Sequence, residues 1–182
     1  NNHSYISGFM QSLGLPEVEK NVLPSINNTF QNIIGARYAL IAPHTSLWQI
    51  ERRNWGYDKF IQLENFLKNE VPTKIIVLED SYSFLEMLSL IKHCEFIVCN
   101  DSGPAIIAQS FDKKSFVVFG ATSPKYLHLN NKSVSIFDEY KHSLCFHKNR
   151  QEEIDCCEPF CMDKFRVRDV YEVIKKEIYG QK

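Results

Sequence analysis

Short apolar runs alternate along the chain with longer segments in which apolar residues recur every three or four positions. The runs predict β-strands at residues 38–42, 74–78, 95–99, 115–119 and 134–137. The recurring positions predict amphipathic helices at residues 2–13, 57–67, 83–91, 103–110 and 167–179. Strands that are apolar on both faces are typical of a parallel sheet covered by helices. The alternation therefore predicts an α/β fold, a Rossmann-like doubly wound parallel sheet.

The same periodicity assigns an inward face to each long helix. In the helix at 57–67 this face holds Phe60, Ile61, Leu63, Phe66 and Leu67. In the helix at 83–91 it holds Phe84, Leu85, Leu88 and Ile91, and in the last helix it holds Val170, Val173, Ile174 and Ile178. We expect these side chains to form the core.

Composition and charge narrow the class of partner. The chain has 182 residues, of which 44% are hydrophobic, so a sizeable core is expected. A formal net charge of -1 gives no bulk attraction to nucleic acid, and none is expected as a partner. No apolar run approaches the roughly 20 residues of a membrane-spanning helix, and the first residues carry no secretory signal. We expect a cytoplasmic protein, either free or peripheral at the inner membrane face.

A turn of small residues follows the predicted strand at 95–99. It reads Asn-Asp-Ser-Gly-Pro at residues 100–104. Ser102 is suited to cap the next helix, Gly103 permits a close backbone approach, and Pro104 fits the first helical turn. The N-terminus of such a helix binds phosphate through its unpaired N–H groups and its dipole. An ordinary capped helix is the alternative.

Two further segments are expected at the same edge of the sheet. Residues 119–124 read Phe-Gly-Ala-Thr-Ser-Pro, and we expect Gly120 and Thr122 to line the same crevice. A plain loop is the alternative. In the long loop after the strand at 38–42, Thr45 and Ser46 supply hydroxyl donors. Arg52 or Arg53 in the same loop supplies a cation able to bind phosphate oxygens through two hydrogen bonds. For a lone arginine, a solvated surface side chain is the alternative.

These motifs together resemble the lipopolysaccharide heptosyltransferase family, the ADP-heptose-using glycosyltransferases of the GT-B fold. The segments that carry the resemblance are 43–46 (Pro-His-Thr-Ser), 53–55 (Arg-Asn-Trp), 101–104, 119–124 and 161–162 (Cys-Met). Leu-Gly-Leu-Pro at 13–16 is similar to the end of the family's helix between its two lobes. The resemblance covers nearly the whole chain. It implies the C-terminal, donor-binding lobe of a two-lobed enzyme.

The resemblance also implies a division of the chain into three segments. Residues 1–35 would form the inter-lobe helix and a connecting segment. Residues 36–140 would form the Rossmann-like domain that binds the nucleotide sugar. Residues 141–182 would form a cysteine-rich loop and the C-terminal helix.

The resemblance further implies a role for each motif. The implied catalytic residues are Arg53, which would neutralise charge on the leaving group, and Asp101, which would contact the sugar. The implied donor-binding residues are Thr45, Ser46, Glu79, Ser102, Gly103, Pro104, Gly120 and Thr122. The implied reaction is an inverting transfer that needs no divalent metal. Its donor is ADP-heptose or another nucleotide-diphosphate sugar, and its acceptor is a glycan, a lipid-linked glycan or a protein. An N-terminal acceptor lobe would supply the general base.

The chain departs from the family pattern at two places. Ile106 stands where the family has histidine. The chain also passes almost directly from Leu78 to Phe84, where the family has a Gly-rich turn, a helix and a short strand. The leading hypothesis is a glycosyltransferase, or its donor-binding lobe. The two departures are the argument for the alternative function, a non-catalytic nucleotide- or carbohydrate-binding module of the same fold.

The cysteines fall into two groups. Cys94 and Cys99 lie in apolar surroundings and are expected in the core. Four others, Cys145, Cys156, Cys157 and Cys161, cluster in a polar stretch. They are able to hold a structural zinc or iron, but their spacing is not that of paired Cys-x-x-Cys motifs. Free or partly paired thiols are the favoured state, and a metal-stapled interaction domain is a third hypothesis for the function.

Overall fold

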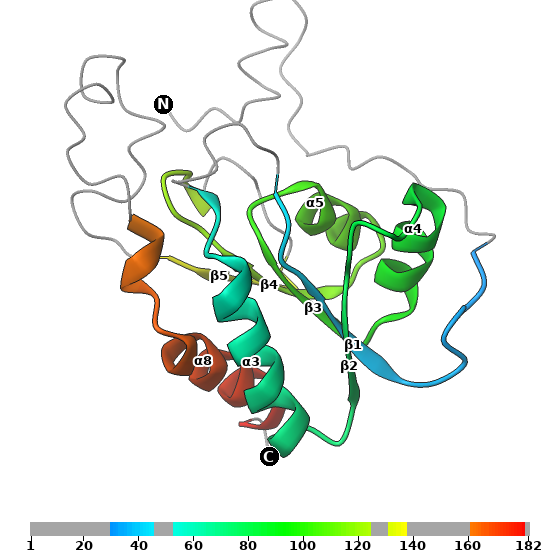
Figure 1. The fold of residues 1–182 in the computed structure, drawn as a ribbon, viewed down its shortest axis with the longest axis horizontal. Helices are drawn as coiled ribbons and strands as arrows, with labels where there is room; N and C mark the ends of the chain where they lie inside the picture. The colour runs from blue at the N-terminus through cyan, green and yellow to red at the C-terminus, as the bar shows by residue number, and fades with distance from the viewer. Residues whose placement is uncertain (1–29, 46–52, 125–130, 138–160, 181–182) are drawn as a thin grey trace, which may run out of the picture.

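The computed structural model describes residues 30–45, 53–124, 131–137 and 161–180, and these form a parallel sheet with helices on both faces (Figure 1). The strands are β1 (Tyr38–Ala42), β2 (Lys74–Val77), β3 (Phe96–Asn100), β4 (Lys114–Val118) and β5 (Ser133–Ile136). Their order across the sheet is β2-β1-β3-β4-β5, and every pair is parallel. The predicted doubly wound α/β fold is confirmed.

Four α-helices in the described part of the chain cover the sheet. They are α3 (Tyr57–Glu70), α4 (Phe84–His93), α5 (Gly103–Ser110) and α8 (Val167–Tyr179), with a short 3-10 helix, η2 (Cys161–Lys164), before α8. Figure 1 shows α3 and α8 together on one face and α4 and α5 on the other. The predicted bounds of β1, α5 and α8 coincide with those observed. The helix predicted at 2–13 lies outside the described residues.

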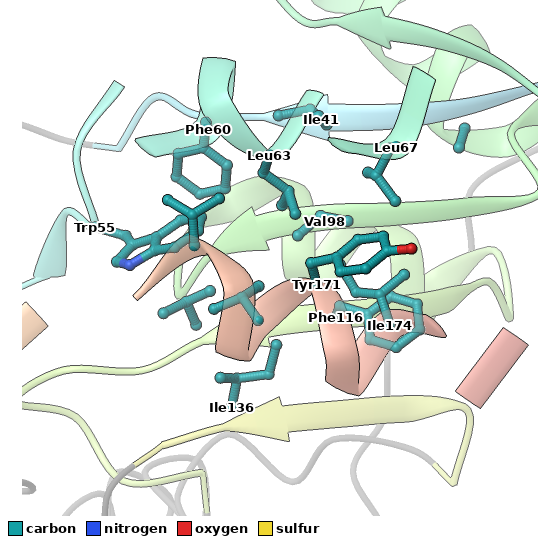
Figure 2. Packing of buried hydrophobic residues seen from close by; sticks show 14 of the residues in the cluster. Ile41, Trp55, Phe60, Leu63, Leu67, Val98, Phe116, Ile136, Tyr171 and Ile174 are labelled. Carbon is teal, nitrogen blue, oxygen red and sulfur yellow. The ribbon is translucent and has the colours of Figure 1, made fainter. Parts of the chain in front are cut away.

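The core on the α3 and α8 face is built around aromatic and branched side chains (Figure 2). Trp55 and Phe60 are fully buried, and their rings meet edge to face with centroids 4.9 Å apart. From α8, Tyr171 and Ile174 pack into the same cluster as Leu63 of α3. The last helix therefore shares a core with the sheet, although the domain division at residue 141 stays a prediction.

The core on the α4 and α5 face is smaller and holds the two predicted core cysteines. Cys94 and Cys99 are buried and unbridged, and burial raises the pKa of the Cys94 thiol to about 12. Such thiols are unreactive at neutral pH. On this face the Tyr38 hydroxyl donates to the Leu90 carbonyl at 2.8 Å, which ties β1 to α4.

The predicted inward faces are wrong at three aromatic or aliphatic positions. Phe84 and Leu85 are 65% and 64% exposed, so the described residues leave the first turn of α4 uncovered. Phe66 is also exposed, because it precedes Leu67 by one residue and so points about 100° away from the buried stripe of α3. Its ring stacks on Tyr171 instead, with centroids 5.5 Å apart.

Candidate functional site

The strand order changes direction between β1 and β3. The chain leaves β1 for β2 on one side and later continues from β3 to β4 on the other. The connections that follow β1 and β3 therefore diverge, which opens a crevice beyond the carboxyl ends of these strands. The pairing of Ala42 with Cys99 and of Ile41 with Val77 brings residues 43–45, 78–80 and 100–103 to this edge.

A pocket of about 300 Å³ occupies this crevice. It is lined by Ala42, His44, Thr45, Leu78, Glu79, Asp80, Tyr82, Met87, Ser102, Gly103 and Pro104. Five predicted donor-binding residues, Thr45, Glu79, Ser102, Gly103 and Pro104, thus come together from three separate loops. The predicted donor residue Ser46 lies outside the described residues.

The N-terminus of α5 forms one wall of the pocket. Ser102 is the N-cap residue and proline stands in the first turn, as predicted. The Ser102 hydroxyl does not cap the helix, however. It donates instead to the Asn100 carbonyl at the strand end, at 3.2 Å. A methyl group added at Gly103 would meet no atom within 4 Å, so the backbone there faces open space.

Arg53, Asp101 and Thr122 form a polar group behind the pocket, in which Asp101 and Thr122 are buried and Arg53 is partly buried. Arg53 Nη2 donates to the Asp101 carbonyl at 2.5 Å and lies 3.5 Å from Asp101 Oδ2. Thr122 Oγ1 donates to the same carboxylate oxygen. The Asp101 side chain is 6% exposed, and this burial raises the pKa of its carboxyl group, against the opposing effects of Thr122 and Arg53. The two predicted catalytic residues are therefore in contact.

Gly120 and Thr122 do not line the pocket, in contrast to the prediction. Both are buried in the turn after β4. Because β4 lies on the far side of β3 from β1, its turn stands behind Asp101 rather than at the opening. Thr122 reaches the site only through its bond to Asp101.

An acidic group lies on the opposite wall. Glu79 accepts a hydrogen bond from the Tyr57 hydroxyl at 3.0 Å, and this bond raises the pKa of that phenol. His44 Nε2 lies 3.8 Å from Glu79 and 4.0 Å from Asp80, and its ring lies against Tyr57 at 5.6 Å between centroids. The sequence analysis did not name His44 or Asp80 as site residues. Each stands two residues after a predicted strand, and His44 lies in the Pro-His-Thr-Ser segment that carries the resemblance.

Asn100 is a further residue that the sequence analysis missed. It ends β3 fully buried, and its Nδ2 donates to the Pro43 carbonyl at 2.7 Å and to Asn54 Oδ1 at 3.2 Å. Its Oδ1 accepts the backbone N–H of Trp55 at 2.9 Å. A buried amide needs such partners, so an asparagine directly after a predicted apolar strand was a signal available in the sequence.

Two polar atoms beside the pocket have no hydrogen-bond partner in the described structure. They are Thr45 Oγ1 and Arg53 Nε, and both are buried. An unpaired buried polar group costs free energy, about 1–3 kcal/mol in typical proteins. Such atoms are favourable places for a polar ligand to bind, because the ligand supplies the missing partner.

The described residues hold no group of three or more His, Cys, Asp or Glu side chains able to bind a metal ion. Cys145, Cys156 and Cys157 lie outside those residues, and nothing is described of the Cys161 side chain. Within the same ranges, no helix has both the length and the apolar character to cross a bilayer.

Comparison with known proteins identifies related folds. A model of Glycosyltransferase family 9 (heptosyltransferase) matches residues 65–154. The iron-containing dodecameric glycosyltransferase TibC from enterotoxigenic E. coli is similar to 93% of this chain, with 17% identity and a TM-score of 0.66. The E. coli ADP-heptose heptosyltransferase II is similar to 77% of the chain, with 14% identity and a TM-score of 0.59.

The E. coli heptosyltransferase WaaC, solved with ADP-2-deoxy-2-fluoro heptose, is similar to 93% of the chain, with 14% identity and a TM-score of 0.55. The matches cover 52%, 46% and 53% of TibC, heptosyltransferase II and WaaC, so this chain spans about half their length. No curated protein sequence matches the chain significantly.

Proposed function

We propose that this heptosyltransferase-like chain, whose residues 65–154 match glycosyltransferase family 9, is the nucleotide-sugar-binding lobe of a glycosyltransferase. The observation that carries the proposal is the pocket at the change of strand direction, walled by the N-terminus of α5. In open α/β sheets this is where nucleotides bind, with phosphate on a helix N-terminus. Structures of TibC with ADP-D-β-D-heptose and of WaaC with a fluorinated ADP-heptose support this donor class.

The walls of the pocket suggest how the donor lies. The diphosphate binds at the backbone of Ser102 and Gly103, where the helix dipole is positive and space is open. Thr45 Oγ1 and Arg53 Nε supply donors that are otherwise unpaired in the described structure. Glu79, held by Tyr57 at the opposite wall, accepts hydrogen bonds from the ribose hydroxyl groups.

The proposed reaction is an inverting transfer that uses no divalent metal. The acceptor oxygen attacks the anomeric carbon from the face opposite the diphosphate, and the bond from that carbon to the phosphate oxygen breaks. The acceptor proton goes to a general base on the other lobe, and the nucleoside diphosphate leaves with an added negative charge. Arg53 and the α5 dipole stabilise that charge. Asp101 lies behind the pocket and holds Arg53 in place for this role.

The proposal extends to the whole enzyme. An acceptor-binding lobe, N-terminal to this one, supplies the other wall of the active site, and the acceptor is a glycan, a lipid-linked glycan or a protein. The proposed location is the cytoplasm, free or at the inner membrane face, and fractionation of cells that express the full-length protein tests it.

Calorimetry with ADP-, GDP- and UDP-sugars tests the donor site. We expect one of them to bind, and Arg53→Ala to weaken binding at least about 10-fold through loss of a charge-assisted contact. Arg37→Ala is the control, because Arg37 is exposed and precedes β1 at the opposite edge of the sheet. Absence of binding by every nucleotide sugar at millimolar concentration would overturn the proposal.

A non-catalytic binding module is the alternative function, and the family match does not favour it. Turnover separates the two hypotheses. Sugar transfer by a protein that contains both lobes supports the enzyme, whereas donor binding without transfer or donor hydrolysis supports the module.

A structural metal at the cysteine-rich segment is the alternative to free thiols. TibC is described as iron-containing, and this chain has four clustered cysteines. Elemental analysis of the purified protein, together with thiol titration, decides between zinc or iron at stoichiometric amounts and free cysteines.

A further inference from the structure

Two consecutive residues at the end of β3 hold the segment before α3 at two points. Asn100 accepts the backbone N–H of Trp55 and donates to the side chain of Asn54. The backbone carbonyl of Asp101, the next residue, accepts a hydrogen bond from the Arg53 guanidinium group. Residues 53–55 are therefore fixed to the strand end by both a main-chain and a side-chain contact.

The Asn100 amide also reaches the third segment of the site. Its second donated hydrogen bond goes to the Pro43 carbonyl, two residues before Thr45. One buried side chain thus joins the end of β1, the end of β3 and the segment that carries Arg53. Asn54 adds stiffness, because its Oδ1 also accepts the Gly56 N–H at 3.0 Å.

We propose that Asn100 is a positioning residue for donor binding, which sets Arg53 and Thr45 at their places relative to the N-terminus of α5. The inference rests on the proposed function of the pocket. Asn100 itself contacts no donor, since the pocket is lined by other residues. It acts by holding Arg53 ready before the donor arrives, so that binding loses less conformational entropy.

The partners of Asn100 explain why an amide is required. The side chain at position 100 must accept the Trp55 N–H and donate to two oxygens, the Pro43 carbonyl oxygen and Asn54 Oδ1. Among side chains of this size, only that of asparagine has both an acceptor and two donors. Aspartate keeps the acceptor but places negative oxygens against the Pro43 carbonyl and Asn54 Oδ1. Asn100→Asp therefore disturbs the geometry of the segment with little change in volume.

The test compares Asn100→Asp with Ser115→Ala. Ser115 is equally buried but lies near the start of β4, where its hydroxyl pairs with Ser133, away from the pocket. The probe is whichever of ADP, GDP and UDP binds the unaltered chain most tightly by calorimetry. We expect Asn100→Asp to weaken binding at least about 10-fold, with Ser115→Ala unchanged.

A double variant shows whether Asn100 acts through Arg53. If it does, Asn100→Asp weakens binding less when added to Arg53→Ala than it does in the unaltered chain, because coupled residues are not additive. The loss that remains is the part that acts through Thr45. Full additivity would overturn this positioning role. Equal affinity of Asn100→Asp and the unaltered chain would overturn it as well.

An NMR measurement without ligand separates this inference from the proposed function. We expect Asn100→Asp to shift the Arg53 Nε–H and Trp55 amide signals, and Ser115→Ala to leave them in place. If no nucleoside diphosphate binds the unaltered chain, the proposed function fails. The signal shifts still test whether Asn100 holds residues 53–55 in place. If Asn100→Asp does not fold, Asn100→Ser is tested in its place, because serine keeps a donor for the Pro43 carbonyl. Unshifted signals of the Arg53 Nε–H and the Trp55 amide in the variant would contradict the inference.

Discussion

At the scale of single residues, Asp101 shows how the site is built at a cost to stability. Its carboxylate is buried beside one partly buried arginine and one hydroxyl group. Burial outweighs both partners, and the pKa of the carboxyl group is raised above its ordinary value of 3.8. A raised pKa in the folded state means that the protonated acid is favoured by folding. The contribution is complete below pH 3.8 and is lost as the pH rises through the raised pKa.

Asp101→Asn is therefore expected to stabilise the fold at neutral pH and to weaken donor binding. The amide keeps an acceptor for Thr122 and carries no charge that burial penalises. In urea unfolding from pH 3 to 8, the free energy of unfolding of the variant should exceed that of the unaltered chain at pH 7. This difference should shrink as the pH falls. A gap that stays constant with pH would show that ionisation of Asp101 is not its source.

Gly103→Ala is expected to separate folding from binding. The added methyl group meets no protein atom in the free chain, and Gly103 has no positive φ, so the free energy of unfolding should change by less than about 0.5 kcal/mol. The same methyl group would occupy the space where the diphosphate approaches α5. Calorimetry should show at least about 10-fold weaker binding of the nucleotide. Unchanged affinity would mean that the phosphate does not bind next to Gly103.

The residues of the site were predictable only in part. Asp101 to Pro104 and Thr45 stood out because small and hydroxylated residues followed apolar runs. The hydrogen bond of the Ser102 hydroxyl group was predicted wrongly. The local sequence does not decide whether that hydroxyl pairs with an amide of the helix or with the Asn100 carbonyl. Asn100 was missed because its three partners belong to segments about 45 residues or more away.

At the scale of elements, α4 shows what periodicity does and does not determine. The helix begins at a complete capping box, in which Ser83 accepts the Glu86 N–H and the Glu86 carboxylate accepts the Ser83 N–H. Its length and type follow from the sequence. The extent to which the helix is covered does not follow from the sequence, since Phe84 lies on the same side as the buried Leu88 and is still exposed. A helical pattern predicts which face is apolar, and the tertiary arrangement decides where that face is covered.

Ser83→Ala is expected to lower the free energy of unfolding by about 1 kcal/mol, since it removes the N-cap. The hydrogen bonds from Ser83 lower the pKa of Glu86. The part of the effect that comes from the bond between the Ser83 hydroxyl and the Glu86 carboxylate should therefore fade as the pH falls through that lowered value, whereas the part that comes from the cap on the Glu86 N–H should persist. Chemical denaturation at several pH values measures it. Ser110→Ala, at the last position of α5, is the control and should change stability by less than about 0.5 kcal/mol.

At the scale of the whole molecule, the sheet separates two hydrophobic cores, one on each of its faces. Large aromatic residues lie in both cores: Trp55, Phe60 and Phe116 on the α3 and α8 face, and Tyr38 and Phe119 on the α4 and α5 face. Trp55 links the first core to the C-terminal part, because its indole N–H donates to the Phe165 carbonyl at 2.8 Å. The end of the chain is therefore expected to unfold with the sheet.

Ile174→Ala tests this expectation. Ile174 is fully buried, so the substitution should lower the free energy of unfolding by about 3 kcal/mol. Tryptophan fluorescence and far-UV circular dichroism should report one shared transition in urea. Val173→Ala, at a partly buried position of the same helix, should cost less. Two separate transitions would show that α8 is stabilised apart from the sheet.

The position of the pocket has a consequence for how the protein can change. Its polar walls, at His44, Thr45, Glu79, Asp80 and Ser102, lie on loops beyond the strand ends and belong to neither hydrophobic core. Substitutions on those walls are free to alter the ligand without disturbing the packing on either face of the sheet. New donor preferences are thus accessible by exchange of a few loop residues, at little risk to folding.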